Sequence, residues 1–348
     1  SKLRAQISFF SGELSNSLKK VGKRFTKEII YGILSSGSVH LTKISRSLEE
    51  EITIHKTHDR LCRNLAEERL GKIIEEEVLK KGAEHIKPNS LIIIDPTDIV
   101  KKYAKKMEYL TKVRDGSTKE IENGYWICQA IATTTGGKNI IPLASRLYSS
   151  IAPDFKSEND VILRTVQDIY DATGYNGIVV FDRGGDRIRL LEPWTKHGLV
   201  NYIIRQVGDR HLWYKRSLIS GLDIAEKCKM KYRETIVKTK DGKQNVFDID
   251  FGVAQVRLPE CPDRKLNLVV VKGFGKKPMM ILTTLPVKQS RKSIWFIIES
   301  YLSRWRIEET IRFIKQSYGI EDIRLLTYNR LKNMIAFVLA ASFFICTH

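Results

Sequence analysis

The sequence predicts an α/β protein in which a mixed sheet follows a set of helices and is interrupted by a β-rich segment. Residues up to about 87 alternate charged and apolar side chains at helical periods. Short apolar runs typical of buried strands begin at Leu91, and strand-like runs dominate from Trp213 to Pro286. A helical pattern returns at Ile294. With 348 residues, 42% of them hydrophobic, the chain is long enough for two or three domains with a core.

The first 88 residues are expected to form a helical domain. Helices are predicted at Phe25–Leu34, Leu41–Leu48 and Thr53–Leu65, with a turn over Ser35-Ser36-Gly37-Ser38. A short helix, a turn and a polar, basic helix are similar to a helix-turn-helix, whose second helix enters the major groove of DNA. A plain helical bundle fits the same pattern, so both interpretations stay open.

The next unit, residues 89–212, is predicted to hold most of the sheet. Its expected elements are strands at Leu91–Ile94, Tyr125–Thr135 and Ile140–Tyr148, a helix at Asn159–Ala172, and strands at Ile178–Phe181 and Gly198–Arg205. Gly136-Gly137 is a hairpin signal between the second and third strands. Three strands with a hairpin, followed by a helix, a strand, a helix and a strand, are typical of the RNase H type of mixed sheet. In that arrangement the first three strands are antiparallel.

Residues 213–290 are interpreted as a β-rich insertion, and residues 291–348 as the C-terminal helices of the interrupted unit. The predicted strands of the insertion are Tyr232–Thr239, Val246–Phe251, Val253–Leu258, Leu266–Val271 and Met279–Leu285, with a turn at Asp241-Gly242. The apolar run Ile335–Cys346 falls short of the ~18 residues that span a bilayer. It is expected to complete a buried helix, and no membrane partner is expected.

The charge balance favours a polyanionic partner. There are 59 Lys+Arg against 40 Asp+Glu, a formal charge of +19, which most simply indicates nucleic acid. A soluble protein that is merely basic is the alternative. The five cysteines are odd in number and never spaced as C-x-x-C, which argues against a disulfide framework and structural zinc. Together with the lack of a recognisable secretory signal, this pattern indicates an intracellular protein.

Three carboxylates form a candidate metal site. Asp95 and Asp182 each follow an apolar strand run directly, and Glu308 lies on a later predicted helix. Carboxylates brought together repel one another unless cations share their charge, and Mg²⁺ or Mn²⁺ suits oxygen ligands. Two such ions ~3.5–4 Å apart can activate a water and stabilise the leaving oxygen of a phosphodiester. For either aspartate alone, an ordinary strand-end turn residue is the alternative.

The helix that carries Glu308 groups four polar residues on one face. At about 100° per residue, Tyr301, Arg304, Glu308 and Lys315 share a stripe about 60° wide. A carboxylate beside two cations and a phenol suits a metal site that also grips phosphate. A ladder of helix-surface salt bridges is the alternative interpretation of the same spacing.

Three sequence blocks give the chain a specific resemblance. They are Ile94-Asp95-Pro96-Thr97-Asp98, Phe181-Asp182-Arg183-Gly184-Gly185-Asp186, and Tyr301 to Glu309 with Lys315, which carries a Tyr-Arg-Glu-Lys signature. The chain resembles a DDE transposase of the RNase H-like superfamily. Within it, the chain is most similar to the insertion-sequence-four family of cut-and-paste bacterial transposases, in which a β-rich insertion between the second Asp and the Glu is also typical.

The resemblance implies roles for particular residues. Asp95, Asp182 and Glu308 would be the catalytic ligands of two Mg²⁺ or Mn²⁺ ions. Residues implied to contact the distorted DNA end or its phosphates are Tyr301, Arg304, Lys315, Arg183 and Arg205. In such enzymes an aromatic residue of the insertion stacks on a flipped base; Trp213 and Trp295 are candidates, with core packing as the alternative for each. Such enzymes cleave double-stranded transposon ends through a hairpin and join the 3′ ends to target DNA. They act as homodimers in the bacterial cytoplasm, at the nucleoid.

Basic stretches outside the three blocks are further candidates for DNA-backbone contacts. They are Lys101-Lys102 with Lys105-Lys106, and Lys272 to Lys277. Each fits an ordinary solvated face equally well. Two rival functions also stay open: an RNase H-like nuclease or resolvase that cuts without strand transfer, and a repurposed, non-catalytic transposase relative that only binds DNA.

Overall fold

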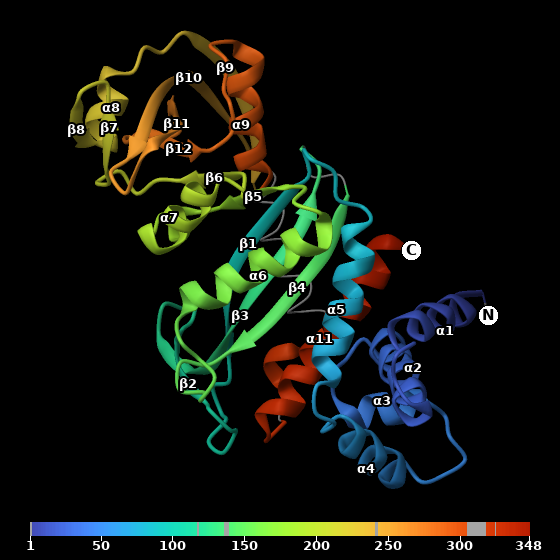
Figure 1. The fold of residues 1–348 in the computed structure, drawn as a ribbon. Coiled ribbons are helices and arrows are strands. Elements are labelled where there is room, and N and C mark those ends of the chain that lie inside the picture. Colours follow the sequence, from blue (N-terminus) through green and yellow to red (C-terminus); the bar gives the residue numbers. More distant parts are fainter. Residues whose placement is uncertain (1, 117, 136–138, 241–242, 305–317, 324) are drawn as a thin grey trace.

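The computed structural model describes residues 2–116, 118–135, 139–240, 243–304, 318–323 and 325–348 (Figure 1). Five helices precede the first strand, and the prediction of a helical N-terminal segment is confirmed. They are α1 (Lys2–Leu14), α2 (Lys20–Ser36), α3 (Leu41–Ser47), α4 (Ile54–Asn64) and α5 (Leu70–Ala83). Thr53 begins α4 as an N-cap, since its side chain accepts a hydrogen bond from the Lys56 amide.

The strands form one mixed sheet. The first part of it contains β1 (Leu91–Val100), β2 (Thr111–Arg114), β3 (Ile121–Thr133), β4 (Ile140–Tyr148), α6 (Glu158–Thr173), β5 (Ile178–Phe181), the short 3₁₀ helix η1 (Arg183–Gly185), α7 (Ile188–His197) and β6 (Tyr202–Arg205). β3 pairs antiparallel with β1, β2 and β4, while β5 runs parallel to β1 and β6 parallel to β5. The antiparallel arrangement predicted for the first three long strands is therefore confirmed.

Two boundaries differ from the prediction for identifiable reasons. β1 does not end before Asp95 but continues to Val100, because β3 supplies a pairing partner at every position as far as Gly124. β6 begins at Tyr202 instead of Gly198, since Gly198 takes a left-handed conformation (φ 66°) that ends α7. The glycine pair 136–137 and the turn at 241–242 lie outside the described residues.

The β-rich segment continues the same sheet. It contains β7 (His211–Tyr214), β8 (Ser217–Ser220), α8 (Gly221–Lys227), β9 (Tyr232–Lys240), β10 (Lys243–Leu258), β11 (Cys261–Lys272) and β12 (Met279–Thr283). The two strands predicted between Val246 and Leu258 are the single strand β10, and α8 was not predicted. β12 pairs antiparallel with β6, with Leu282 opposite Ile204, so these strands extend the sheet at its β6 edge. The proposed domain boundaries remain predictions.

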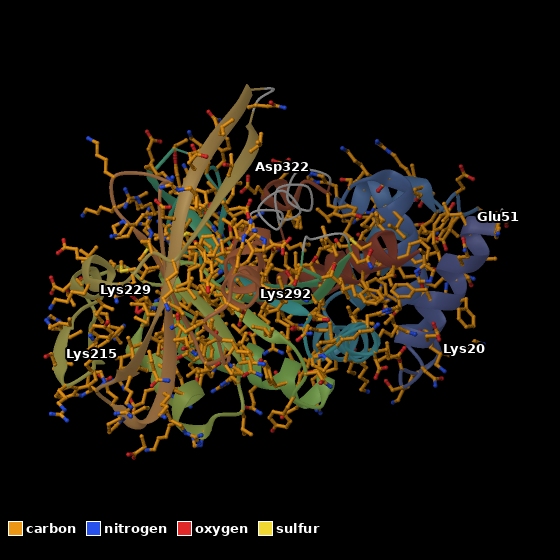
Figure 2. The ribbon with its side chains drawn as sticks, turned by 90° about the horizontal axis from the view of Figure 1, so that it is seen from above. Lys20, Glu51, Lys215, Lys229, Lys292 and Asp322 are labelled. Atoms are coloured by element: carbon orange, nitrogen blue, oxygen red, sulfur yellow. The ribbon has the colours of Figure 1, made fainter. Side chains whose placement is uncertain are left out.

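Helices cover both faces of the sheet. α6 and α7 pack on one face, and α9 (Arg291–Ser303) packs on the other beside β5 and β6. The 3₁₀ helix η2 (Ile320–Asp322) leads to α11 (Tyr328–Thr347), which lies against β4, α5 and α2. Lys20 and Glu51 mark the helical end of the molecule and Lys215 the opposite end (Figure 2).

α11 contains the apolar run that was expected to complete a buried helix. Among the helices in the described part of the chain, it is the one long and apolar enough to cross a membrane by length and composition. In this structure, however, 72% of its most apolar window is buried inside the protein. Its side chains join those of α1, α2 and α5 in one core, so the prediction of a buried helix is confirmed.

Candidate active site

Asp95 and Asp182 lie at the same level on neighbouring parallel strands. Ile93 of β1 is opposite Val180 of β5, and continuing this register by two residues brings Asp95 level with Asp182. In the same way, Phe181 pairs with Ile204 of β6, which brings Arg205 level with Asp182. The structure therefore arranges two carboxylates and a guanidinium in a row across three adjacent strands.

This polar row lies on the face of the sheet that α9 covers. Ile93, Val180 and Ile203 precede the row by two residues on their strands, and all three belong to the core beneath α9. Because side chains alternate between the two faces of a strand, Asp95, Asp182 and Arg205 fall on that same face. All three are half-buried. Apolar packing thus fixes the strands, while the polar row stays accessible at its edge.

The turn after Asp182 is held by a network of hydrogen bonds. Asp182 Oδ1 accepts from the Gly184 amide at 2.7 Å, and no described residue donates to its Oδ2. Asp186 Oδ1 pairs with Arg210 Nε at 2.5 Å, and its Oδ2 accepts from the Val207 amide at 2.8 Å. Asp186 therefore ties the turn carrying Asp182 to the loop after β6. Sequence reasoning gave Asp186 no role, although it belongs to the second block.

Tyr301 and Arg304 lie at the C-terminal end of α9. The Arg304 guanidinium lies 6.0 Å from the centre of the Tyr301 ring, which agrees with their predicted neighbouring positions on one helix face. Tyr301 is 1% exposed and belongs to the core beneath α9, and Arg304 is 7% exposed. The direct DNA contact predicted for Tyr301 is thus not available in this arrangement, because its ring is a core side chain. Its position supports Arg304 instead.

The third predicted ligand, Glu308, and Lys315 lie outside the described residues, so their placement relative to Asp95 stays a prediction. In the described ranges, no three His, Cys, Asp or Glu side chains gather into a group that could hold a metal ion. The two aspartates nevertheless fit a divalent cation in chemistry. Both are oxygen ligands, both are half-buried, and they share one level and one face of the sheet.

The predicted DNA contact at Lys101 is corrected by the structure. Lys101 is 4% exposed, and its ammonium donates to the backbone carbonyls of Ile320, Glu321 and Ile323 at 2.6, 2.7 and 3.0 Å. A buried cation held by carbonyls cannot also bind a phosphate. Lys102, in contrast, is exposed, with Glu122 3.8 Å from its ammonium. Arg183, next to Asp182, is also exposed.

The two tryptophans predicted as base-stacking candidates differ in environment. Trp295 is half-buried on α9, and its ring centre lies 5.8 Å from that of Phe251 on β10, so it is a core-packing residue. Trp213 is 37% exposed on β7, at the far edge of the sheet from β1. Trp213 is the more exposed of the two, and its role stays a prediction.

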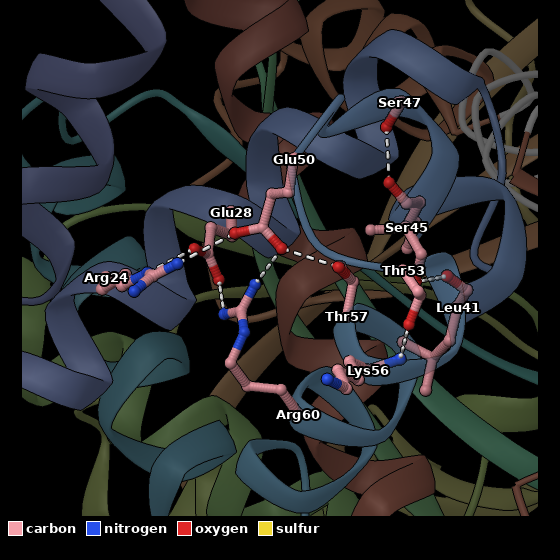
Figure 3. Close-up of polar contacts among 11 residues, drawn as sticks. Arg24, Glu28, Leu41, Ser45, Ser47, Glu50, Thr53, Lys56, Thr57 and Arg60 are labelled. Atoms are coloured by element: carbon pink, nitrogen blue, oxygen red, sulfur yellow. Dashed lines mark hydrogen bonds and ion pairs between the residues drawn. The ribbon is translucent and has the colours of Figure 1, made fainter.

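A charged network braces the N-terminal helices (Figure 3). Arg60 of α4 pairs with Glu28 of α2, and with Glu50 in the α3–α4 loop at 2.7 Å. Arg24 of α2 pairs with the same two carboxylates at 2.6 and 2.8 Å, and Thr57 donates to Glu50 at 2.7 Å. Burial raises the pKa of Glu50, but hydrogen bonds from Thr57 and Arg60 outweigh it and hold that pKa below its ordinary value.

Arg60→Ala should lower the free energy of unfolding by about 1–2 kcal/mol, because it leaves two part-buried carboxylates with only the exposed Arg24 as a shared partner. Arg24→Ala is the matched control: Arg24 contacts the same carboxylates but is 62% exposed, so its effect should be smaller.

The network should also make stability depend on pH. Since the pKa of Glu50 is depressed in the folded state, the stabilisation by its carboxylate is present at neutral pH and lost as the pH falls through that folded-state pKa. Thermal unfolding of wild type and Glu50→Gln from about pH 7 to pH 3 measures this. A constant difference across that range would contradict it.

The protein is a mixed α/β fold in which Asp95 and Asp182 lie level on one face of the sheet. A family model described as "Transposase DDE domain" matches residues 86–344, and the chain therefore belongs to this family. Membership implies a DNA-cleaving transposase. The fold is also similar to that of the piggyBac transposase in a cryo-EM structure of its synaptic complex with hairpin DNA. That similarity has a TM-score of 0.51 and 11% sequence identity, covering 100% of this chain and 73% of that one. No curated protein sequence matches the chain.

Proposed function

We propose that the protein is a cut-and-paste transposase of the insertion-sequence-four type, with an RNase H-like catalytic unit. The observation that carries the proposal is the row of Asp95 and Asp182 on adjacent parallel strands of a DDE-family chain. The strand order β4–β3–β1–β5–β6, with β5 and β6 parallel to β1, supports the RNase H-like assignment. The Tyr301–Lys315 signature supports the narrower family.

Asp95 and Asp182, with Glu308, would hold two Mg²⁺ or Mn²⁺ ions. Bound there, the ions would supply an activated water and charge stabilisation for phosphodiester cleavage. The chain's own residues would do the rest. The Asp182 turn is fixed by the Gly184 amide and by the Asp186–Arg210 pair, which keeps the carboxylate in place before substrate arrives. Preorganised ligands of this kind need little rearrangement during reaction.

Cations around the carboxylate row would hold the DNA. Arg205 lies level with Asp182, and exposed Arg183 follows it directly. Guanidinium groups can bind phosphate oxygens with two parallel hydrogen bonds. Arg304 and Lys315 would grip the distorted end during formation of a hairpin intermediate, and Tyr301 would fix Arg304. The solved complex that shares this fold is of a transposase with hairpin DNA, which supports the same intermediate here.

The N-terminal helices would recognise the transposon end. α4 presents Lys56 and Arg63 to solvent, while Arg60, one turn from each of them, is fixed to α2 and to the α3–α4 loop. This geometry supports α4 as a helix entering the major groove. The +19 charge supports DNA as the partner. A homodimer in the synaptic complex and a location at the bacterial nucleoid complete the proposal.

A strand-transfer assay tests the function. The substrates are an intact and a pre-cut duplex that carry the terminal inverted repeat, to be identified from the DNA that flanks the coding sequence. The target is supercoiled plasmid, and the cofactor is Mg²⁺ or Mn²⁺. We expect cleavage of intact ends and covalent joining of pre-cut ends to plasmid. Cleavage without joining would favour the nuclease or resolvase. Binding without cleavage would favour a repurposed DNA-binding relative.

A further inference from the structure

A rigid basic loop with an exposed aromatic ring follows β1. We define the Tyr103 loop as residues 102–106. Tyr103 is 77% exposed, and Lys102, Lys105 and Lys106 around it are exposed as well. Within the described ranges Lys105 and Lys106 form no ion pair, and the ring of Tyr103 stacks on no other ring. The loop therefore presents three cations and an aromatic face to solvent.

The backbone of this loop is fixed at both ends. On the β1 side, Lys101 donates its three hydrogen bonds to carbonyls of 320–323, and the Ala104 amide donates to the Lys101 carbonyl at 2.9 Å. On the other side, Met107 is 7% exposed in the helical core, and the Glu108 amide donates to the Leu326 carbonyl at 2.9 Å. Buried anchors on both sides imply that little conformational entropy is lost when the loop binds a partner.

The loop forms the rim of a cleft of about 800 Å³ between the N-terminal helices and the sheet. One wall is Val100–Ala104, another is Val39–Thr42 with His58 of α4, and the third includes Asp115, Glu321 and Asp322. The carboxylate of Asp322 on the third wall disfavours a phosphate deep inside the cleft. A polyanion is therefore accommodated across the rim, where Lys102 and Tyr103 lie, and not within the cleft.

The rim of the cleft lies between the two proposed DNA-binding sites, α4 and the carboxylate row that contains Asp95. Val100 lies five positions after Asp95 on β1, a distance of about 17 Å, which corresponds to about five base pairs of duplex. α4, the proposed recognition helix, supplies His58 to the opposite wall of the cleft. The Tyr103 loop therefore lies between α4, across the cleft, and Asp95, further back along β1.

We infer that the Tyr103 loop binds the transposon-end duplex between its recognition sequence and its cleavage point. The three lysines contact phosphates, and the Tyr103 ring packs on the DNA. The inference rests on the proposed function, because it takes the transposon end as the ligand. It assigns binding to the residues beside Lys101, and to Lys101 itself only the anchoring of the loop.

The test compares two variants with the same change of charge. Lys102→Gln/Lys105→Gln/Lys106→Gln removes the cations of the loop. Lys196→Gln/Lys227→Gln/Lys265→Gln removes three exposed lysines outside the Tyr103 loop. Lys196 and Lys227 lie on α7 and α8, which pack on the opposite face of the sheet from Asp95, and Lys265 lies on β11, which β5, β6 and β12 separate from β1. Affinity for the end duplex is measured by fluorescence anisotropy from about 50 to 200 mM salt. Each lost phosphate contact flattens the log–log salt dependence by about 0.9, so the loop variant should lose about 2–3 units of slope and the control less than one.

Tyr103→Ala should weaken binding about fivefold or more without changing the salt slope, and Tyr103→Phe should restore binding.

Neutral methylphosphonate linkages locate the phosphate contacts. Placed singly along the first helical turn of the end duplex, they should weaken binding by the wild-type protein at one or two positions, and binding by the loop variant should be insensitive to them there. Equal slopes for the loop and control variants overturn the inference, provided that wild type cleaves the end. Salt-independent binding by wild type with no cleavage would instead overturn the proposed function.

Discussion

Asp95→Ala and Asp182→Ala should each lower end cleavage by about a thousandfold or more, while end binding stays within about threefold. The reason is that ligands of a shared metal site act as a unit, so losing one disables the site. Glu308→Ala should behave in the same way. Cleavage is followed on denaturing gels with Mg²⁺, and binding by gel shift without it. Asp171→Ala, on the exposed surface of α6, is the matched control and should cut normally.

A thermal measurement separates this result from misfolding. Asp95 and Asp182 are like charges at the same level of adjacent strands, so Asp95→Ala should leave the melting temperature in chelator unchanged or higher. Asp182→Asn, which keeps an oxygen to accept from the Gly184 amide, should do the same. Added Mg²⁺ should raise the melting temperature of wild type but not of the variants, because binding to the folded state stabilises it. Near-normal cutting by either variant, or an unchanged Mg²⁺ shift, would remove that residue from the site.

The sequence predicted the strands of the site but not their alignment. The apolar runs before Asp95 and Asp182 are strong strand signals, and both strands formed. Whether Asp95 lies at the same height as Asp182 depends on the parallel register between β1 and β5. The packing of the intervening strands and of α6 determines that register. Hydrophobic periodicity carries no information about that register. The alternation of side chains then places both carboxylates on one face, which the sequence alone could suggest only by analogy.

Lys101 shows where local reasoning fails. In the sequence it is one of several lysines, indistinguishable from Lys102. Its partners, the carbonyls of residues 320–323, begin 219 residues later in the chain. Burial set by such distant contacts cannot be read from a charge run. α5 belongs to the helical N-terminal domain predicted for residues 1–88, a division that stays a prediction. Because α5 packs against α11 and β4, deleting residues 1–88 would expose core, and point substitutions are the cleaner test.

Tyr301 shows a related limit. Helical spacing placed it correctly beside Arg304, but spacing cannot tell an exposed stripe from a buried one. The ring belongs to the core beneath α9. Tyr301→Phe should therefore be mild. Tyr301→Ala should lower stability by about 3–5 kcal/mol, as expected for truncating a buried aromatic ring, and it would displace Arg304 indirectly.

Removing the charge of Arg304 or Lys315 should impair hairpin formation far more than the first nick. A hairpin requires a sharply bent backbone whose crowded phosphates repel, so that step depends on nearby cations. A charge-assisted hydrogen bond contributes about 1.5–3 kcal/mol, which corresponds to about a 10- to 150-fold loss in hairpin formation and resolution. Because Arg304 is 7% exposed, Arg304→Met is preferred to alanine: it removes the charge and keeps most of the volume.

Arg304→Lys and Lys315→Gln complete the set. Arg304→Lys keeps the charge but loses the two parallel hydrogen bonds of a guanidinium, so hairpin yield should fall between wild type and Arg304→Met. Nicked, hairpin and fully cleaved products are resolved over time on denaturing gels, beginning from intact and from pre-nicked ends. The pre-nicked substrate isolates the hairpin step from the first cut. If nicking falls as much as hairpin formation in Arg304→Met and Lys315→Gln, the two cations hold phosphate throughout the reaction, and the specific role in bending the end is wrong.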